Sequence, residues 1–503
     1  MSEAVTSINS SRSAQPEESD RNRWLALIVL CAGMLMIVLD QTIVNVALPS
    51  IQDDLGFSQS SLAWVVNAYL IPFAGLLLLA GRFGDLIGQR RMFLYGIAAF
   101  VAASVLCGIA QTQEMLIGAR FLQGAGGAMA SAVILGMIVR MFPQPRDQAK
   151  AIGVYSFVAS AGASIGLLLG GVLTEAINWH WIFFVNVPIG AVAALFAVRL
   201  IREDEGLGLY RGADVLGGAL VTSALMLAVY TIVEAVDYGW GSLHTLGLGA
   251  VSLALLGAFL YRETRIANPM MPLRIFRSRN VAGANAIQML MVAGLFGMFF
   301  LGSLYLERVL GYGPLEIGLA FLPVALAIGI LSLGFSERLV MRFGARATLI
   351  PGLGLIVASL LWFSQIPVES EYVTNLLPAM LLMGVGAGLT FPSVMNLAMS
   401  GATPEDSGLA SGLVNTTLQA GGALGLAVLA TLSTTRTENL AADGASPAAA
   451  LTDGFQLAWI IGAGLVAAAL VVAVAVLRPA PAAAPASELD TEPEPEPALS
   501  EAA

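Results

Sequence analysis

Long apolar runs separated by short polar breaks make up most of this chain. Fourteen of these runs are long enough to cross about 30 Å of hydrocarbon as a helix that rises about 1.5 Å per residue. The pattern therefore predicts an all-α polytopic membrane protein. The expected spans start near Trp24, Leu62, Met92, Met115, Ala149, Trp181, Ala213, Leu243, Val281, Leu315, Ala347, Val373, Ser407 and Phe455.

Basic residues are distributed unevenly about these spans. Of 24 basic residues, all but Arg120, Arg308 and Arg436 fall in the tails or in the loops on one side of this topology. Lys and Arg beside a span are retained on the cytoplasmic side of a membrane. An even number of spans puts both termini on that side, so we expect a multi-pass protein of the cytoplasmic membrane with both termini cytoplasmic.

The pattern of glycines repeats in the second half of the chain. Gly88 and Gly96 recur as Gly344 and Gly352, and Gly162 recurs as Gly421. Six spans thus correspond to six others, which predicts parallel halves with a binding site at their interface. We expect a disordered cytoplasmic tail at 1–23, an N-terminal six-helix bundle at 24–201, two additional transmembrane helices with linkers at 202–265, a C-terminal six-helix bundle at 266–478 and a disordered acidic Pro/Ala-rich cytoplasmic tail at 479–503.

Composition agrees with a membrane protein. Of the 503 residues, 57% are hydrophobic and 12% are charged, whereas soluble domains carry about 25% charged residues. The net charge of −10 owes much to six acidic residues in the final tail. Cys31 and Cys107 both fall in apolar runs, so neither a disulfide framework nor a metal site is expected.

One short polar stretch, Gly81 to Arg91, lies between the second and third runs. Three glycines (Gly81, Gly84 and Gly88) permit tight turns, three arginines (Arg82, Arg90 and Arg91) favour the cytoplasmic side, and Asp85 can cap a helix or pair with an arginine. We interpret the stretch as a short hinge on the membrane surface that joins two spans.

Several stretches together resemble the major facilitator superfamily, in particular its fourteen-helix drug:proton antiporter branch. The resemblance covers roughly residues 24 to 477 and includes Leu39-Asp-Gln-Thr-Ile-Val-Asn-Val-Ala-Leu-Pro49, the Gly81 to Arg91 stretch, Arg120-Phe-Leu-Gln-Gly and Trp181-Ile-Phe-Phe-Val-Asn-Val-Pro188. It implies two six-helix halves plus two extra central helices. It also implies proton-driven export of amphipathic drugs or antibiotics, as in self-resistance exporters of antibiotic-producing actinomycetes.

The fifth span carries a glycine motif that resembles the antiporter motif of this family. Gly162, Gly166, Gly170 and Gly171 are present, but Leu167 stands where the family has a proline. The glycines permit close helix packing. The missing proline bears on the kink of this helix and on the direction of transport.

Two ionisable residues, Asp40 and Arg120, lie deep inside spans of the first half. Such groups are costly in a membrane unless they are paired or line a wet cavity. Counting residues from the helix ends gives the two side chains similar depths. We predict that Asp40 is the main proton acceptor and that Arg120 tunes it; the alternative is a structural salt bridge between the first and fourth spans.

Polar and aromatic groups inside other spans are candidates for a substrate cavity. Amides supply hydrogen bonds and rings supply apolar walls, which together suit an amphipathic molecule. For each of these residues, ordinary helix packing is the alternative. The candidates are Asn67, Tyr69, Tyr155, Asn285, Gln288, Phe296, Phe300, Asn415 and Gln419.

Other functions are less well supported by the sequence. The only lysine, Lys150, has no glycine-rich loop before it, which argues against ATP hydrolysis. We expect no enzyme activity, no cofactor beyond the proton gradient, no bound metal, no nucleic-acid partner and a monomer. A facilitator-fold importer of a metabolite and a non-transporting membrane sensor remain as alternatives.

Overall fold

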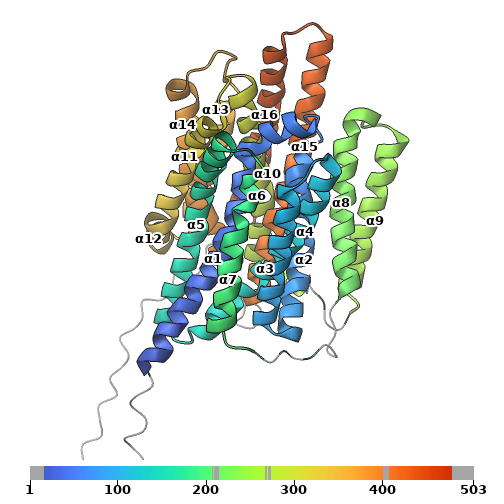
Figure 1. Cartoon of the computed structure of the whole chain (residues 1–503). Helices are drawn as coiled ribbons and strands as arrows, with labels where there is room; N and C mark the ends of the chain where they lie inside the picture. The colour runs from blue at the N-terminus through green and yellow to red at the C-terminus, as the bar shows by residue number, and fades with distance from the viewer. Residues whose placement is uncertain are drawn as a thin grey trace, which may run out of the picture.

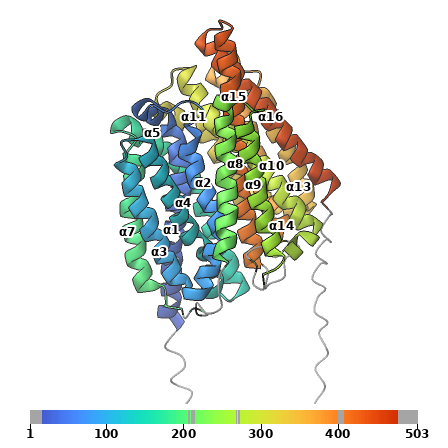
Figure 2. The ribbon, with the colours of Figure 1, turned by 90° about the vertical axis from the view of Figure 1, so that its right-hand side faces the viewer.

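The structure, a computed structural model, describes residues 16–477 apart from 205, 207, 209–213, 267–268, 270–272 and 400–406. Within these residues the ordered elements are helices, and no strand occurs. They stand side by side in one bundle, and the first and last described residues lie at the same end of it (Figures 1 and 2). We call that end the terminal face and the opposite end the far face.

The first half of the chain forms six crossings of this bundle. Helices α6 and α7 together make the sixth crossing, because the helix breaks at Val185. The elements are α1 (Pro16–Leu55), α2 (Ala63–Ile87), α3 (Gln89–Gly108), α4 (Gln113–Met141), α5 (Pro145–Ala176), α6 (Trp181–Phe184) and α7 (Asn186–Leu200).

The second half repeats this arrangement. Its second crossing is interrupted by a π-helical turn, η3 (Leu331–Phe335), and its fourth crossing begins with another, η4 (Tyr372–Leu376). A short 3-10 helix, η2 (Leu273–Arg277), comes before the first crossing. The α-helices are α10 (Arg279–Arg308), α11 (Pro314–Ile330), α12 (Ser336–Phe343), α13 (Ala345–Phe363), α14 (Leu377–Met399), α15 (Ser407–Ala442) and α16 (Pro447–Ala475).

Repeated glycines occupy equivalent places in the two halves. Gly88 (φ +102°) and Gly344 (φ +88°) each form the single-residue turn before a helix, α3 or α13. Such a positive φ is strained for any residue with a Cβ. The neighbours also correspond, because α1 packs on α5 and α7 whereas α10 packs on α15 and α16. The internal repeat read from the glycines is therefore a structural repeat.

Two further helices, α8 (Val215–Tyr238) and α9 (Leu243–Glu263), stand at the side of the bundle (Figure 1). Helix α8 packs on both α2 and α15, so it contacts both halves. Much of α9 is exposed, including Leu243 and Leu253. An exposed apolar helix of this length is suited to contact with lipid.

Twelve helices in the described part of the chain are long and apolar enough to cross a membrane. Two shorter apolar segments, Ile165–Ala176 in α5 and Pro314–Ile330 in α11, occupy the places of the other two expected spans. The molecule is thus a multi-pass membrane protein, and the total of fourteen spans stays a prediction.

The interpretation of Gly81 to Arg91 as a surface hinge was wrong in its extent. Helix α2 continues through Gly81, Arg82 and Asp85 to Ile87, and α3 begins at Gln89. Only Gly88 lies between the two helices. The physical reason is that hydropathy marks where a helix leaves hydrocarbon, whereas polar residues continue the same backbone hydrogen bonds beyond that level.

Candidate functional site

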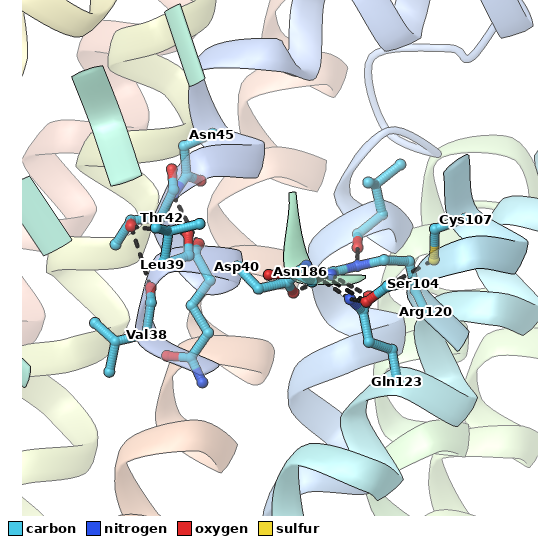
Figure 3. Close-up of polar contacts among 12 residues, drawn as sticks. Val38, Leu39, Asp40, Thr42, Asn45, Ser104, Cys107, Arg120, Gln123 and Asn186 are labelled. Atoms are coloured by element: carbon cyan, nitrogen blue, oxygen red, sulfur yellow. Dashed lines mark hydrogen bonds and ion pairs between the residues drawn. The ribbon is translucent and has the colours of Figure 1, made fainter. Parts of the chain in front are cut away.

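Asp40 on α1 and Arg120 on α4 meet inside the first half of the bundle. Arg120 Nη1 lies 2.5 Å from Asp40 Oδ2, and the two side chains are 1% and 0% exposed. Charged groups removed from water are stable only when they are paired and hydrogen-bonded. The two ionisable residues singled out in the sequence therefore form a buried ion pair (Figure 3).

Two amide side chains complete the surroundings of the Asp40 carboxylate. Gln123 Nε2 donates to Asp40 Oδ1 over 2.7 Å, and Asn186 Nδ2 donates to the same oxygen over 2.9 Å. Gln123 Nε2 also lies 2.8 Å from Ser104 Oγ. The carboxylate thus receives three donors, which come from α4 and α7 (Figure 3).

Arg120 is held from the other side by groups of α2, α4 and α6. Its Nε donates to the carbonyl oxygen of Val65 over 3.0 Å, and its Nη1 donates to Gln123 Oε1 over 2.7 Å. Its guanidinium carbon lies 4.5 Å from the centre of the Tyr69 ring and 5.7 Å from that of Phe183. Cation–π contacts of this kind strengthen when water is excluded.

The surroundings isolate this pair from other charges. Within the described residues, every other acidic or basic side chain lies in a loop or within about two turns of a helix end. The other buried acids, Asp214 and Glu263, lie at the ends of α8 and α9. The charges of Asp40 and Arg120 cancel while the two side chains remain paired.

Gln123, Asn186 and Ser104 were not singled out from the sequence. Gln123 lies three residues after Arg120, so the two share one face of α4, and that spacing could have identified it. Asn186 follows the helix break at Val185, so the periodicity of the preceding apolar residues could not predict which way its side chain points.

At the terminal face, two acidic residues in the segment after α7 connect the start of α3, the end of α4 and the end of α7. Asp204 Oδ2 and Oδ1 accept the backbone N–H groups of Gln89 and Arg90 over 2.8 and 3.1 Å, and Oδ2 lies 3.2 Å from Arg140 Nη1. Glu203 Oε1 lies 2.5 Å from Arg91 Nη2. These contacts of Glu203 and Asp204, which we call the clasp, connect the start of α3 to the end of α7 and, through Arg140, to the end of α4.

Both acids in this clasp stay ionised over a wide pH range. Hydrogen bonding to Arg91 lowers the pKa of Glu203. For Asp204, burial raises the pKa, but the backbone N–H groups of Gln89 and Arg90 and the charge of Arg140 outweigh it, so the net pKa lies below the ordinary 3.8.

Other residues of the α2–α3 turn have different surroundings. Arg90 Nη2 donates to the carbonyl oxygen of Val198 over 2.5 Å. Gly81, Arg82 and Asp85 are half-buried on the last turns of α2. The structure therefore connects Arg90 and Arg91 to the segment around the end of α7, whereas Gly81, Arg82 and Asp85 lie on α2 and Gly88 lies between the two helices.

The glycines of α5 lie where this helix touches its neighbours. A Cβ on Gly162 would lie 3.0 Å from Leu35 on α1, and one on Gly170 would lie 2.7 Å from the carbonyl oxygen of Ile43. Gly166 faces Thr42, which also lies on α1. The helix continues through Leu167 without a break from Pro145 to Ala176.

Gly171 belongs to a different contact, between α5 and the start of α11. A Cβ there would lie 2.7 Å from the carbonyl oxygen of Pro314 and 2.8 Å from Leu315 Cα. Glu175 Oε2 accepts the backbone N–H of Leu315 over 3.0 Å. These contacts join the two halves at the far face.

A second connection between the halves at the far face comes from α1 and α10. Arg308 on α10 pairs with Asp53 on α1, and Ser303 Oγ donates to the carbonyl oxygen of Asn45 over 2.8 Å. Because both partners of the ion pair are partly exposed, the pair contributes little stability alone. The far face is nevertheless closed at several points.

Comparison with known proteins identifies the family. A family model described as the Major Facilitator Superfamily matches residues 30–426. The chain belongs to the major facilitator superfamily. The chain is 38% identical over 473 residues to the puromycin resistance protein pur8 of Streptomyces alboniger, covering 92% of this chain and 94% of that protein. It is 36% identical to the cephamycin export protein CmcT of Amycolatopsis lactamdurans, covering 84% and 87%.

The fold of this facilitator also matches solved structures. An auto-inhibited peptide transporter of the POT family superimposes with a TM-score of 0.66 at 15% identity, covering 92% of this chain and 99% of that one. At this identity the likeness concerns the fold alone.

The substrate candidates of this facilitator are spread over both halves. Tyr69 lies against Arg120, and Tyr155 Oη lies 3.4 Å from Met34 Sδ. Asn285 Oδ1 accepts from Thr417 Oγ1 over 2.9 Å. Phe296 and Asn415 are half-buried, and Asn67, Gln288, Phe300 and Gln419 are buried.

The structure places few of these candidates in direct contact with one another. Gly422 on α15 packs against two other helices that carry candidates, because a Cβ there would lie 3.4 Å from both Leu70 on α2 and Phe296 on α10. Helices α2, α10 and α15 therefore converge at the interface of the halves. A role in substrate binding stays a prediction for each candidate.

Metal binding has no support in the described part of this facilitator. Among those residues, no group of three His, Cys, Asp or Glu side chains could hold an ion. Cys31 and Cys107 are both free and buried, and Cys107 Sγ lies 3.6 Å from Gln123 Oε1.

Proposed function

We propose that this chain is a proton-coupled antiporter that exports an amphipathic drug or antibiotic across the cytoplasmic membrane by alternating access. The observation that carries the proposal is the buried Asp40–Arg120 pair, 2.5 Å across, in an interior with little other charge. The names of the relatives, which refer to antibiotic resistance and export, support the substrate class. The proton gradient supplies the energy, and no cofactor is required.

Asp40 is the proton acceptor in this proposal, and Arg120 is its partner. Protonation of Asp40 removes the negative member of a buried pair, which leaves the guanidinium with Gln123 Oε1 and the carbonyl oxygen of Val65. Losing one partner of a buried pair costs about 3–5 kcal/mol. A cost of that size is enough to favour a second arrangement of α1 and α4, and so to couple protonation to a conformational change.

Alternation requires contacts that open and close at the two faces. At the far face these are the Gly171–Pro314 approach and the Arg308–Asp53 pair. At the terminal face we assign a gating role to the segment where α2 ends and α3 begins, with Gly81, Arg82, Asp85, Gly88, Arg90 and Arg91. Substrate binding is assigned to the interface of the halves, where α2, α10 and α15 converge, with the candidates of α2, α5, α10 and α15.

The topology in this proposal has fourteen spans with both termini in the cytoplasm, so the terminal face is the cytoplasmic face. The bundles are 24–201 and 266–478, with two additional helices in 202–265 and tails at 1–23 and 479–503. Contact of α8 with both α2 and α15 supports a place beside the interface of the halves. The transporter acts on its small-molecule substrate as a monomer in the bilayer.

The deciding experiment uses inverted membrane vesicles with an acidic lumen. Cationic and neutral antibiotics are added in turn while lumenal pH is followed. A transported compound should raise lumenal pH in vesicles with the wild-type protein, but not with Asp40→Asn. Asp443→Asn is the matched control, because that acid is exposed, and it should behave as wild type.

Two alternatives have distinct outcomes in the same assay. A metabolite importer, which Leu167 in place of the motif proline keeps open as an alternative, would leave lumenal pH unchanged with every antibiotic but would accumulate a labelled nutrient in whole cells. A non-transporting sensor would give neither signal. Full proton-driven export by Asp40→Asn would refute the assignment of the proton to Asp40.

A further inference from the structure

A cavity of about 450 Å³ opens at the terminal face of the first half. The beginnings of α1 and α3, the ends of α4 and α7 and the segment after α7 enclose it. The helix ends that enclose it lie at the lower end of the bundle in Figure 1. It is remote from the Asp40 cluster, because Arg23 lies about 25 Å along α1 from Asp40 and Arg140 lies about 30 Å along α4 from Arg120, at about 1.5 Å per residue.

Arginines dominate the charge of this cavity. Its walls carry Arg23, Arg140, Arg199 and Arg202 against two carboxylates, Glu203 and Asp204. Four positive charges against two negative ones leave a net charge of +2.

Both carboxylates in the wall are already engaged. Glu203 pairs with Arg91, and Asp204 accepts two backbone N–H groups and pairs with Arg140. In contrast, Arg199 and Arg202 are exposed and form no ion pair with any residue that the structure describes. Two guanidinium groups are therefore available to an anion in the cavity.

Apolar surfaces lead to this cavity along two helices. On α7, Val192, Leu195 and Val198 are each more than half exposed, and Arg199 follows them directly. On α1, Ile28 is 59% exposed and lies just beyond Arg23. Exposed apolar side chains of membrane helices face acyl chains, so the first arginines beyond them lie at the level of lipid phosphates.

We propose that this cavity binds the phosphate of an anionic phospholipid, with the acyl chains along the exposed faces of α1 and α7. Guanidinium groups bind phosphate through paired, charge-assisted hydrogen bonds, and basic pockets between membrane helices are suited to anionic headgroups. The lipid would connect the ends of α1, α4 and α7. These helices carry Asp40, Arg120 and Asn186, so the bound lipid would stabilise the half that holds the buried pair.

The test places the full chain in nanodiscs of phosphatidylcholine with phosphatidylglycerol and counts the phosphatidylglycerol molecules retained by native mass spectrometry. Arg199→Gln/Arg202→Gln should lower the affinity for phosphatidylglycerol about tenfold or more, because each basic residue at a membrane surface contributes about 1 kcal/mol. The matched control is Arg338→Gln/Arg342→Gln. It removes the same charge from exposed positions on α12 of the second half and should retain the lipid as wild type does.

Two further arms distinguish the possible results. Arg199→Lys/Arg202→Lys keeps the charge and should recover most of the binding, which also separates loss of lipid from loss of folding. Millimolar inorganic phosphate, added in phosphatidylcholine alone, should not raise the melting temperature. Equal loss in both glutamine pairs would show that attraction to the membrane is general, and stabilisation by free phosphate would show that the ligand is soluble; either result overturns the proposal.

Discussion

The side-chain amide of Asn186 donates to the carboxylate of Asp40 over 2.9 Å, although 146 positions separate the two residues. This contact links α7 to α1. With the donors from Arg120 and Gln123, it occupies three of the about four acceptor sites of the carboxylate.

Replacing Asn186 should therefore weaken coupling more than folding. Asn186→Ala removes one donor, and the loss of a buried hydrogen bond costs about 1–3 kcal/mol. We expect proton-linked export in vesicles to fall about tenfold while the protein remains folded. Asn178→Ala is the control, because Asn178 is an exposed residue of the far face. Unchanged proton-linked export by Asn186→Ala would show that this donor does not act on Asp40 during transport.

Separating Arg120 from Asp40 should reveal how much stability the pair supplies. Arg120→Gln leaves a buried carboxylate without its counter-charge, which should lower the free energy of unfolding by about 3–5 kcal/mol. Asp40→Asn/Arg120→Gln removes both charges and should recover most of that loss in thermal melting. Neither variant should export in response to protons. Proton-coupled export by the double variant would mean that the pair is only a structural salt bridge.

Enlarging Gly171 should open the far face. A Cβ there meets the backbone of Pro314 and Leu315, which cannot rotate away as a side chain can, and overpacking costs about 1–3 kcal/mol. In Gly171→Val we expect about tenfold faster labelling of a reporter cysteine at Ser303 by an impermeant maleimide. Gly118→Val should not change the rate, because a Cβ at Gly118 has no atom within 4 Å. Equal labelling in both variants would count against the α5–α11 contact as a gate.

Acid should loosen the clasp at Asp204. Its pKa is lowered in the folded protein from the ordinary 3.8, so its stabilising effect is complete at neutral pH and is lost as pH falls through the folded pKa. Asp204→Asn should lower the melting temperature at pH 7, and the difference from wild type should shrink below about pH 4. Asp237→Asn, at an exposed position of α8, should show no such difference. A gap that stays constant down to pH 3 would contradict the ionised clasp.

The sequence predicted the fold and the central pair for identifiable reasons. Spans are visible because each needs about 20 apolar residues, and Asp40 and Arg120 are conspicuous because charges are rare at that depth. Counting residues gave their depths but not the faces of the helices on which they lie. The contact itself therefore depended on tertiary packing.

The remaining members of the site carry weaker signals. Gln123 and Asn186 are neutral amides, which occur in membrane helices for packing as well as for function. Asp204 lies in a polar segment with no periodic pattern, so the sequence did not indicate that it caps α3. The predicted extent of α2 was wrong for a related reason. The length of an apolar run reflects the thickness of the hydrocarbon layer, and a helix can continue beyond that layer.

The number of interior carboxylates leads to a prediction about charge movement, which rests on the proposed antiport. Asp40 is the only acidic side chain deep within a helix of the described part, so we expect one proton per transported molecule. Exchange for a monovalent cation then moves no net charge, whereas exchange for a neutral compound moves one. A membrane potential acts on one charge with about 2.3 kcal/mol per 100 mV.

Proteoliposomes with a potential clamped by valinomycin can separate these two cases. The steady-state gradient of a neutral substrate should change about tenfold for each ~60 mV, while that of a monovalent cation should depend on the pH gradient alone. Asp40→Asn should abolish both dependences, which controls for passive leakage. A monovalent cation whose gradient also changed tenfold over that interval would require a second proton. Since no second interior carboxylate is described, that proton would have to be carried by an acid near a helix end, and Asp85 on α2 would be the first to replace.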